Sequence, residues 1–515
     1  MRPISFADLL RGVPVVRCDG DPALPITDVC YDSRLARPGS LFVALRGGYT
    51  DGHRYLQDAR ARGAVAALVE AWEPALAEYP AAAAVPDTRA ALPQVALNFF
   101  QHPADALGMI GITGTDGKTT TSYLVDALLR SAGLRTGLIG TIAVRVGDEI
   151  VDHDARQTTP ESLDVQRLLA RMRDADVDWA ILEATSHGLA LHRLDGCPFD
   201  VAVVTNITHE HLEFHGSIAA YRQAKARLLE RVAARPARPY ATGVVLNRDD
   251  EGVRSIAAAA GAAPILWFSS RGNAADLRAE DVRLSASGTS FRLITPAGDA
   301  TVHLNLIGGF NVDNALAAAG VGHLLGLSPD VIARGLASLP GVPGRMRRLD
   351  LGQPFTVIVD YAHTPDSLEK ALRLIRSLVP GRIIAVFGSA GERDRTKRPL
   401  QGAVAARLAD FSVFTSEDPR FEDPDAIIAE IAAGAREAGA VEGRDYICVE
   451  DRRAAIRAAI ERAAPGDAIL LAGKGHERCI IYGAERRTWD EAEEAALALR
   501  ERGYGLSDAA GKGEP

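Results

Sequence analysis

Cysteine is scarce in this chain of 515 residues, and its five cysteines are scattered with no Cys-x-x-Cys pair. This scarcity excludes a disulfide framework and a zinc ribbon, and it favours a reducing cytosol. Long hydrophobic runs are also missing: no segment approaches the length of a membrane span, and the first residues contain no apolar signal core. We therefore expect a cytoplasmic protein without membrane insertion.

An excess of positive charge is absent as well. The chain carries 58 Lys and Arg against 67 Asp and Glu, a formal net charge of −9. Binding a polyanion requires a basic surface, so this balance argues against nucleic acid as the main partner, and solubility alone explains the acidity. With 47% hydrophobic and 24% charged residues the composition is that of a globular protein. A single core does not extend over such a length, so three domains are expected.

The most informative stretch is Gly-Ile-Thr-Gly-Thr-Asp-Gly-Lys-Thr-Thr-Thr, residues 111–121. It follows the apolar run Leu107–Ile112 and precedes an amphipathic segment, which predicts a strand, a glycine turn and a helix. The backbone N–H groups of such a turn form a cradle for polyphosphate. Lys118 would add positive charge at the terminal phosphates, and the Thr119 hydroxyl would hold Mg²⁺. Ile112 stands where an ordinary Walker A motif has glycine, so this is a tighter subclass used by a few ATP-dependent ligases.

Strand and helix patterns predict an α/β fold with three domains and a tail. Residues 1–100 form a small N-terminal α/β domain. Residues 101–343 form a P-loop domain with a parallel sheet and an antiparallel β insertion at Leu284–Leu306. After the Pro- and Gly-rich stretch at 339–345, residues 344–503 form a Rossmann-like domain without a Gly-x-Gly-x-x-Gly fingerprint. Residues 504–515 are predicted to be a disordered tail.

Several polar residues stand at places where chemistry could occur, but each has a plain structural explanation. Glu183 ends a predicted buried strand, where an α/β sheet presents functional groups or a solvated carboxylate. The spacing of His209, His211 and His215 would allow a zinc site, although no cysteine supports one. Lys225, taken alone, is a solvated helical lysine.

Four motifs occur in one order along the chain: Gly114–Thr120, Asn206–His215, Gly309–Asn314 and Asp360–Asp366. Together they resemble the Mur ligases of bacterial peptidoglycan synthesis. Gln157-Thr-Thr-Pro, Glu417-Asp-Pro-Arg and Gly473-Lys-Gly-His-Glu resemble the branch that adds a diamino acid to UDP-MurNAc-L-Ala-D-Glu. The resemblance extends from about Ile26 to Arg500. It implies a cytoplasmic monomer that uses ATP and Mg²⁺ and forms an amide bond through an acyl phosphate.

The resemblance also assigns roles to single residues. Lys118, Lys225, Glu183 and His211 would be catalytic. Two Mg²⁺ ions would be held by Thr119, Glu183, His211 and a carbamylated Lys225 (N6-carboxylysine), while His209 and His215 would be structural or surface residues. ATP would contact Gly114, Thr115, Asp116, Gly117, Lys118, Thr119, Thr120, Asn314, Arg345, Asp360 and His363. Without the resemblance, Asn311 and Asn314 are equally well explained as helix caps.

Two further sets of residues would bind the other substrates. The UDP-MurNAc-dipeptide would contact Ser33, Gln157, Thr158, Thr159, Thr185 and Arg193. The amino acid would contact Arg393, Glu417, Asp418, Pro419, Arg420, Gly473 and Glu477. The chain departs from the usual pattern at Gln157, where asparagine is common, at Thr185, where serine is usual, and at Leu191, where many members have glutamine and a polar contact would be lost.

The identity of the amino acid stays open at this level. Arg420 could pair with the distal carboxylate of meso-diaminopimelate, which slightly favours that substrate. Asp418 replaces a usual asparagine, and its negative charge would oppose that carboxylate and suit the distal ammonium of lysine or ornithine.

Two less favoured hypotheses for the function are a folylpolyglutamate synthase-like ligase and a nucleotide-binding module without catalysis. Asp32-Ser33-Arg34 in the first domain and the Gly473 motif disfavour the synthase. The intact Lys118, Thr119, Glu183, His211 and Lys225 disfavour the module.

Overall fold

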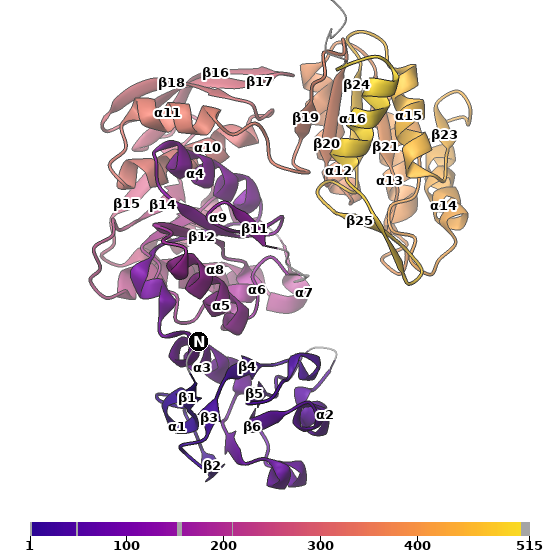
Figure 1. Cartoon of the computed structure of the whole chain (residues 1–515). Coiled ribbons are helices and arrows are strands. Elements are labelled where there is room, and N and C mark those ends of the chain that lie inside the picture. The colour runs from indigo at the N-terminus through magenta and orange to yellow at the C-terminus, as the bar shows by residue number, and fades with distance from the viewer. Residues whose placement is uncertain (1–2, 48–49, 152–156, 209, 506–515) are drawn as a thin grey trace, which may run out of the picture. The chain divides into compact units, whose positions relative to one another are not determined.

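The computed structural model describes residues 3–47, 50–151, 157–208 and 210–505 (Figure 1). The chain divides into two compact units. The first comprises Met1–Glu280, Arg292–Thr301 and Asp313–Ser338, and the second comprises Asp281–Phe291, Val302–Val312 and Leu339–Pro515. The three large sheets fall into the three predicted regions, whose exact limits stay predictions.

The N-terminal region is built on a five-stranded sheet of order β2-β7-β6-β5-β4. Strands β4 to β7 are parallel and β2 is antiparallel to β7. Their apolar runs are buried because the sheet is covered on both faces. The elements are β1 (Ile4–Ser5), α1 (Phe6–Leu9), β2 (Arg17–Gly20), β3 (Pro25–Ile26), β4 (Asp28–Cys30), β5 (Ser40–Val43), α2 (Leu56–Ala61), β6 (Ala64–Val69), β7 (Ala81–Ala84) and α3 (Thr88–Phe100).

The central region contains an eleven-stranded sheet of order β11-β10-β9-β12-β8-β13-β14-β15-β16-β17-β18. From β9 to β16 neighbouring strands are parallel, as the near-continuous apolar runs predict. Its strands are β8 (Gly108–Thr113), β9 (Thr136–Ile139), β10 (Val144–Val146), β11 (Glu149–Val151), β12 (Trp179–Glu183), β13 (Val201–Val204), β14 (Gly243–Asn247), β15 (Ile265–Ser269), β16 (Leu277–Ser285), β17 (Gly288–Thr295) and β18 (Gly298–Leu304). Its helices are α4 (Lys118–Ser131), α5 (Ser162–Asp174), α6 (Ser186–Ala190), α7 (Leu212–His215), α8 (Ile218–Ala234), α9 (Glu251–Ile256), α10 (Phe310–Leu324) and α11 (Pro329–Ala337).

The β insertion predicted at Leu284–Leu306 begins earlier and is not a separate sheet. Strand β16 starts at Leu277 and pairs in parallel with β15, so β16, β17 and β18 extend the central sheet. Two-residue turns join these neighbouring strands, which requires β17 to run antiparallel to both. Charged residues in Leu277–Ser285 hide the start of β16 from a pattern search.

The C-terminal region has a six-stranded sheet of order β19-β20-β24-β21-β22-β23, parallel from β20 to β23. This confirms the Rossmann-like prediction. Its elements are β19 (Arg347–Leu349), β20 (Thr356–Asp360), α12 (Pro365–Leu378), β21 (Ile383–Phe387), α13 (Lys397–Leu408), β22 (Phe411–Phe414), α14 (Pro424–Glu437), β23 (Tyr446–Cys448), α15 (Arg452–Arg462), β24 (Ala468–Ala472), β25 (Cys479–Tyr482), β26 (Glu485–Thr488) and α16 (Glu491–Glu501).

Tyr504 lies at the start of the predicted tail, 504–515, and contacts the C-terminal region. The ring of Tyr504 packs edge-on against Phe355 with centroids 5.7 Å apart, because an aromatic side chain next to a helix end can still cover the core. The rest of the predicted tail, from residue 506, lies outside the described residues.

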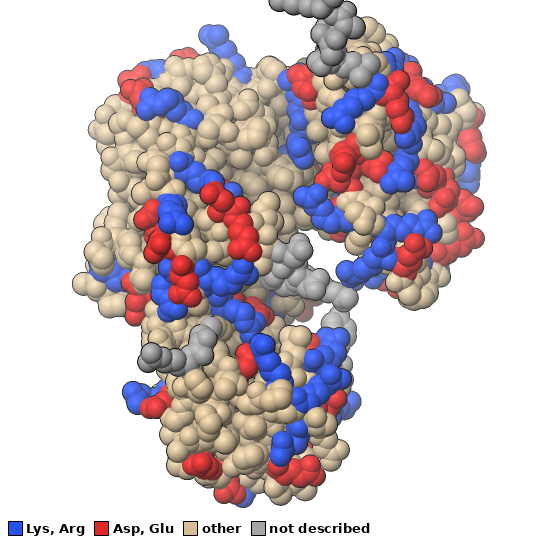
Figure 2. Space-filling model, viewed as in Figure 1, with Lys and Arg blue, Asp and Glu red and all other residues tan. Residues whose placement is uncertain are grey.

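Two surface properties complete the description. In the described part of the chain, no helix is both long and apolar enough to cross a membrane. On the face drawn in Figure 2, basic and acidic side chains are intermingled. Exposed ion pairs also occur, such as Arg171–Glu149 and Arg457–Glu501, and each of them contributes little to stability.

Candidate active site

The glycine turn lies at the carboxyl end of β8, in the middle of the central sheet. Strand β8 is flanked by β12 and β13, and the turn Gly114–Gly117 leads directly into α4. The predicted strand, turn and helix are thus confirmed. The N–H groups at the start of α4 lie at the carboxyl end of the central strands, where α/β proteins bind phosphates.

Two glycines of this turn are required by close packing. A Cβ atom on Gly114, whose φ is +155°, would lie 1.9 Å from the Thr205 hydroxyl oxygen. A Cβ atom on Gly117, at φ +83°, would lie 2.3 Å from Oδ1 of Asn314. These neighbours leave no room for any other residue.

The loop that follows β13 fixes the shape of the turn. The N–H of Thr115 donates to the carbonyl of Asn206 at 2.8 Å, and the N–H of Asp116 donates to Oδ1 of Asn206 at 2.8 Å. The hydroxyl of Thr205 donates to the carbonyl of Asp116 at 2.6 Å. The cradle is therefore held in place from a strand about 90 residues further along the chain.

Lys118 and Lys225 converge on one backbone carbonyl. Nζ of Lys118 donates to the carbonyls of Gly114 at 2.9 Å and Thr115 at 2.7 Å. Nζ of Lys225, from the middle of α8, donates to the same Gly114 carbonyl at 2.7 Å. Two ammonium groups that share one acceptor repel each other, so this point of the site is strongly electropositive.

Lys225 is not the solvated helical lysine that its position in α8 suggests by itself. Its side chain is 1% exposed, and its ammonium lies 4.6 Å from the centre of the Tyr221 ring. The Tyr221 hydroxyl in turn lies 3.0 Å from the hydroxyl of Thr115 in the glycine turn. Burial, and then the charge of Lys118, hold the pKa of Lys225 well below its usual value.

Glu183 lies at the end of β12 and accepts hydrogen bonds from nearby hydroxyl groups. Its Oε2 accepts hydrogen bonds from the hydroxyls of Thr119 at 3.0 Å and Thr141 at 2.8 Å. Its Oε1 accepts the N–H of Thr141 at 3.1 Å. A buried carboxylate surrounded by hydroxyl oxygens is a donor set that suits a hard cation such as Mg²⁺, so Thr119 and Glu183 fit the predicted metal site.

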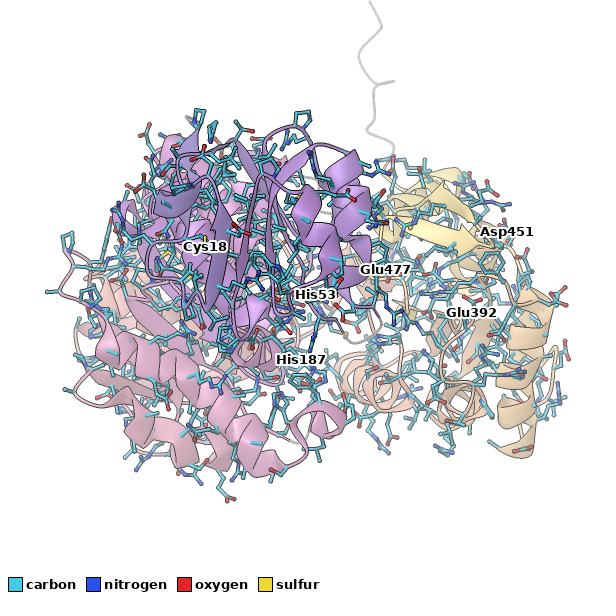
Figure 3. The ribbon with its side chains drawn as sticks, turned by 90° about the horizontal axis from the view of Figure 1, so that it is seen from below. Cys18, His53, His187, Glu392, Asp451 and Glu477 are labelled. Atoms are coloured by element: carbon cyan, nitrogen blue, oxygen red, sulfur yellow. The ribbon has the colours of Figure 1, made fainter. Side chains whose placement is uncertain are left out.

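The described histidines of this region, His187, His211 and His215, pack against one another. His211 begins α7 with a left-handed φ of +54°, and its ring contacts Glu210, Glu213 and His187. His187, labelled in Figure 3, packs between the rings of His211 and His215. Among the described residues, no group of three or more His, Cys, Asp or Glu side chains is placed to hold a metal ion. His209 lies outside the described residues.

The threonines expected to bind the dipeptide lie around Glu183. The hydroxyl of Thr159 donates to the Glu183 carbonyl at 2.7 Å and lies 2.9 Å from the hydroxyl of Thr185. The hydroxyl of Thr158 lies 3.0 Å from that of Thr141, which itself donates to Glu183. The structure thus brings these predicted residues together beside the predicted metal ligands.

Arg193, a predicted dipeptide contact, is hydrogen-bonded within the protein. Its Nε donates to Oε1 of Glu161 at 3.0 Å and its Nη1 donates to the Thr159 carbonyl at 3.1 Å. Arg89 shares the same Glu161 oxygen at 2.8 Å. Glu161 compensates the charge of Arg193, and Arg193 in turn holds the Thr159 backbone in place. Nη2 of Arg193 has no hydrogen bond to the described residues.

The other expected dipeptide contacts lie further out. Ser33 is buried in the N-terminal region, in the turn capped by the carboxylate of Asp32. Gln157 is exposed. Leu191 ends α6, where its N–H donates to the His187 carbonyl at 2.8 Å, so its backbone position does not depend on a polar side chain.

The two asparagines near α10 behave differently. Oδ1 of Asn314 accepts the hydroxyl of Thr121 in α4 at 3.3 Å, beside the glycine turn. Nδ2 of Asn311 donates to the Ile307 carbonyl at 2.9 Å, a local contact with the residues that precede α10.

In the second unit, the Asp360 loop packs on the Gly473 motif. The carboxylate of Asp360 accepts the N–H groups of Met346 at 2.7 Å and Ala362 at 2.8 Å, so it organises the loop; burial raises its pKa. The ring of Tyr361 lies 4.9 Å from the His476 ring and 5.5 Å from the Arg345 guanidinium. The carbonyl of His363 accepts the ammonium of Lys397 at 3.0 Å.

The predicted amino-acid residues gather at the carboxyl ends of β22 and β24. Oδ1 of Asp418 accepts the ammonium of Lys474 at 2.9 Å, and Oε2 of Glu477 accepts the same ammonium at 2.5 Å. Glu417 is buried beside Gly473, and burial raises its pKa. Pro419 packs its carbonyl against Gly391, while Arg393 is exposed.

Four residues of the site were not assigned a role from sequence: Thr141, Thr205, Tyr221 and Lys474. Thr205 could have been suspected because it directly precedes the quoted motif Asn206–His215, and Tyr221 because it lies one helical turn before Lys225. Lys474 lies inside the quoted Gly473 motif, but no role was predicted for it. No local signal distinguishes Thr141.

Comparison with known proteins agrees with this geometry. Family models match along the chain in order: the Mur ligase family catalytic domain at 25–110, the Mur ligase middle domain at 112–322, and the Mur ligase glutamate ligase domain at 344–475. The three matches cover the regions that carry the three large sheets.

Similar proteins of nearly the same length are known. A UDP-N-acetylmuramyl-tripeptide synthetase of Roseiflexus sp. is 49% identical, over 93% of this chain and 96% of its own. A UDP-N-acetylmuramoyl-L-alanyl-D-glutamate–2,6-diaminopimelate ligase of Geobacter metallireducens is 43% identical, over 97% and 99%. A solved structure of a ligase with that same name matches with a TM-score of 0.68 and 32% identity, over 98% of this chain and 99% of that one. With all three domain models matched and relatives this similar over their full length, the chain belongs to the Mur ligase family.

Proposed function

We propose that this chain is an ATP-dependent ligase that joins a diamino acid to the D-Glu residue of UDP-MurNAc-L-Ala-D-Glu in peptidoglycan precursor synthesis. The observation that carries the proposal is the convergence of Lys118 and Lys225 on the Gly114 carbonyl, beside the hydroxyl-lined Glu183. The names and the full-length similarity of the relatives support the substrate.

The reaction requires activation, because a carboxylate is a poor electrophile. One oxygen of the D-Glu carboxylate attacks the γ-phosphorus of ATP, the bond to the bridging oxygen breaks, and ADP leaves. The amine of the incoming amino acid then attacks the carbonyl carbon of the acyl phosphate. Phosphate departs with the oxygen that came from the carboxylate, and the amine loses a proton. Most of the catalysis of such a phosphoryl transfer is positioning and neutralisation of charge.

The chain supplies those two functions from fixed groups. The N–H groups of the glycine turn would bind the phosphates, and Lys118 would stabilise the negative charge that develops on the transferred phosphoryl group. Thr119 and Glu183 would hold Mg²⁺, which when bound neutralises phosphate oxygens as a Lewis acid. Thr158, Thr159 and Thr185 would orient the acceptor, since their hydroxyls already lie beside Glu183.

We also propose that Lys225 is carbamylated. In this step the Lys225 ammonium first loses one proton; the neutral amine then attacks CO₂, an N–C bond forms as one C–O π bond breaks, and a second proton is released, so a cation beside Lys118 becomes an anion. That change removes the repulsion between the two ammonium groups, and the carbamate nitrogen keeps one N–H for the Gly114 carbonyl. Its oxygens would complete a metal site with His211, whose side chain is 41% exposed.

The amino acid favoured by the pocket is meso-diaminopimelate. Arg420 offers its guanidinium to a second carboxylate, and Glu477 offers a carboxylate to an ammonium group. Lysine or ornithine would leave Arg420 unmatched, and they stand as the alternative. The ATP contacts of Arg345, Asp360 and His363, a monomeric state and a cytoplasmic location stay predictions of the resemblance.

The test is phosphate release with ATP, Mg²⁺ and UDP-MurNAc-L-Ala-D-Glu, with diaminopimelate, lysine and ornithine added separately. We expect release that requires both the dipeptide and diaminopimelate, and a product whose mass equals their sum minus one water. Release with lysine or ornithine but not diaminopimelate would overturn the amino-acid assignment. ATP binding without turnover under any of the three would favour a non-catalytic module.

A further inference from the structure

A buried ion pair in the second unit joins two loops of the proposed amino-acid pocket. Asp418 follows β22 and Lys474 follows β24, and β21 is the single strand between these two in the sheet. Both loops leave the same edge, because β24, β21 and β22 are parallel. The ammonium of Lys474 spans the gap to Oδ1 of Asp418 at 2.9 Å.

Arg452, at the start of α15, fixes the roots of the same two loops. Its guanidinium is fully buried and donates to the carbonyl of Ser416 at 3.0 Å and to the carbonyl of Ala472 at 2.7 Å. Glu491 neutralises it at 2.6 Å, and the indole N–H of Trp489 donates to Glu491 at 2.7 Å. Because every partner is satisfied, the spacing between Asp418 and Lys474 is set by the fold and not by a ligand.

The surroundings of Lys474 favour its charged ammonium form. Its side chain is 0% exposed, and burial alone would lower its pKa. Contact with Glu477 and Asp418 outweighs burial and raises the pKa of Lys474 above its usual value. The Lys474 ammonium is thus held charged by the two acidic groups that face it.

The negative charge of Asp418 is compensated by the Lys474 ammonium. Its Oδ1 accepts both the Lys474 ammonium and the N–H of Ile481 at 3.0 Å, and its side chain is only 11% exposed. A ligand approaching this carboxylate meets a dipole and not an isolated negative charge. The conflict that the sequence suggested between Asp418 and a distal carboxylate is therefore removed.

Arg420, two residues after Asp418, supplies a cation on the same loop. It adopts a left-handed φ of +54° and is held by hydrogen bonds from its N–H to the Ile481 carbonyl and from the Gly483 N–H to its own carbonyl. Its Nε is buried and has no hydrogen-bond partner among the described residues. Strained backbone and an unsatisfied buried donor are both features of a binding residue.

We propose that Lys474 is a positioning residue that sets the choice of amino acid by cancelling the charge of Asp418. Lys474 contacts both carboxylates, so the three groups keep one net negative charge; Asp418 is 11% exposed and Glu477 is 34% exposed, so that charge is presented mainly by Glu477, labelled in Figure 3. Arg420 then attracts a distal carboxylate and Glu477 attracts the distal ammonium. The pocket then selects a side chain that ends in both groups, as in meso-diaminopimelate, over lysine or ornithine. This inference rests on the proposed function, because it assumes that the diamino acid binds here.

The test compares kcat/KM for diaminopimelate and for lysine in the full chain and in variants. In Lys474→Met the Asp418 charge is exposed, so we expect the preference for diaminopimelate over lysine to fall at least about tenfold. In the double variant D418N/K474M no charge is left to cancel, and the preference should return to within about threefold of the unmodified chain. Lys370→Met, which removes the exposed pair between Lys370 and Asp366 in α12, is the control that should change nothing.

The outcomes separate the inference from the proposed function. If the unmodified chain makes no product with diaminopimelate, the proposed function is wrong. If it does, but Lys474→Met slows diaminopimelate and lysine equally, or D418N/K474M does not restore the preference, Lys474 has a merely structural role and the inference is overturned. Should Lys474→Met not fold, Lys474→Gln with and without Asp418→Asn gives the same comparison, because glutamine keeps a donor but not the charge.

Discussion

Replacing Lys118 by methionine should reduce ligation by at least about a hundredfold, the typical cost of removing one electrostatic contact to a transition state. Lys118 is the cation of the glycine turn, and its Nζ also bonds the carbonyls of Gly114 and Thr115, so methionine removes charge while keeping length. Phosphate release in the presence of the dipeptide and diaminopimelate measures the loss.

The matched control is Arg130→Met, in the last turn of the same helix α4. Arg130 is exposed and donates to the carbonyl of Gly147 at 3.2 Å, far along the helix from the turn. Its removal should leave the rate within about threefold. If Lys118→Met retained comparable activity, the glycine turn would not be the site of phosphoryl transfer.

Replacing Lys225 by alanine should also reduce ligation by about a hundredfold, and the kind of rescue tells which charge the site needs. If Lys225 acts as a carbamate, added acetate or another small acid should restore part of the rate, since it supplies a carboxylate oxygen in the vacated space. If Lys225 acts as an ammonium, methylamine should restore it instead. The measurement is phosphate release against concentration of each additive.

Gln223→Ala is the control for that series, because Gln223 lies on the same helix α8 and forms an exposed contact with Glu230 at 3.1 Å. It should show neither loss nor rescue. Rescue of Lys225→Ala by methylamine and not by acetate would contradict carbamylation, and an undiminished rate would remove Lys225 from the site.

Much of the fold was predictable because its strands carry their own signal. The runs at Trp179–Glu183, Val201–Val204, Thr356–Asp360 and Ala468–Ala472 are almost wholly apolar, with polar residues only at strand ends, as strands buried on both faces should be, and each is a strand. Strand β16 was misplaced because charged residues interrupt its alternation. The order of strands within a sheet has no comparable local signal, and that order decides which loops meet.

The residues of the site also divide into those that a local sequence pattern reveals and those that only the fold brings together. Lys118, Thr119 and Glu183 were predicted because each ends a strand or begins a helix in a recognisable pattern. The bonds from Asn206 and Thr205 to the glycine turn, and from Lys474 to Asp418, join residues far apart in sequence. The pairing of Arg193 with Glu161 likewise joins residues far apart in the sequence, and only the fold reveals it.

The most direct test of the account is the fate of the carboxylate oxygen. With ¹⁸O in the carboxylates of the D-Glu residue of UDP-MurNAc-L-Ala-D-Glu, the proposed reaction transfers one labelled oxygen to each phosphate released during ligation. Mass spectrometry of the phosphate, with ATP, Mg²⁺ and diaminopimelate present, should therefore find one ¹⁸O per phosphate. Phosphate without label, released alongside the ligated product, would contradict activation of the acceptor carboxylate at the glycine turn.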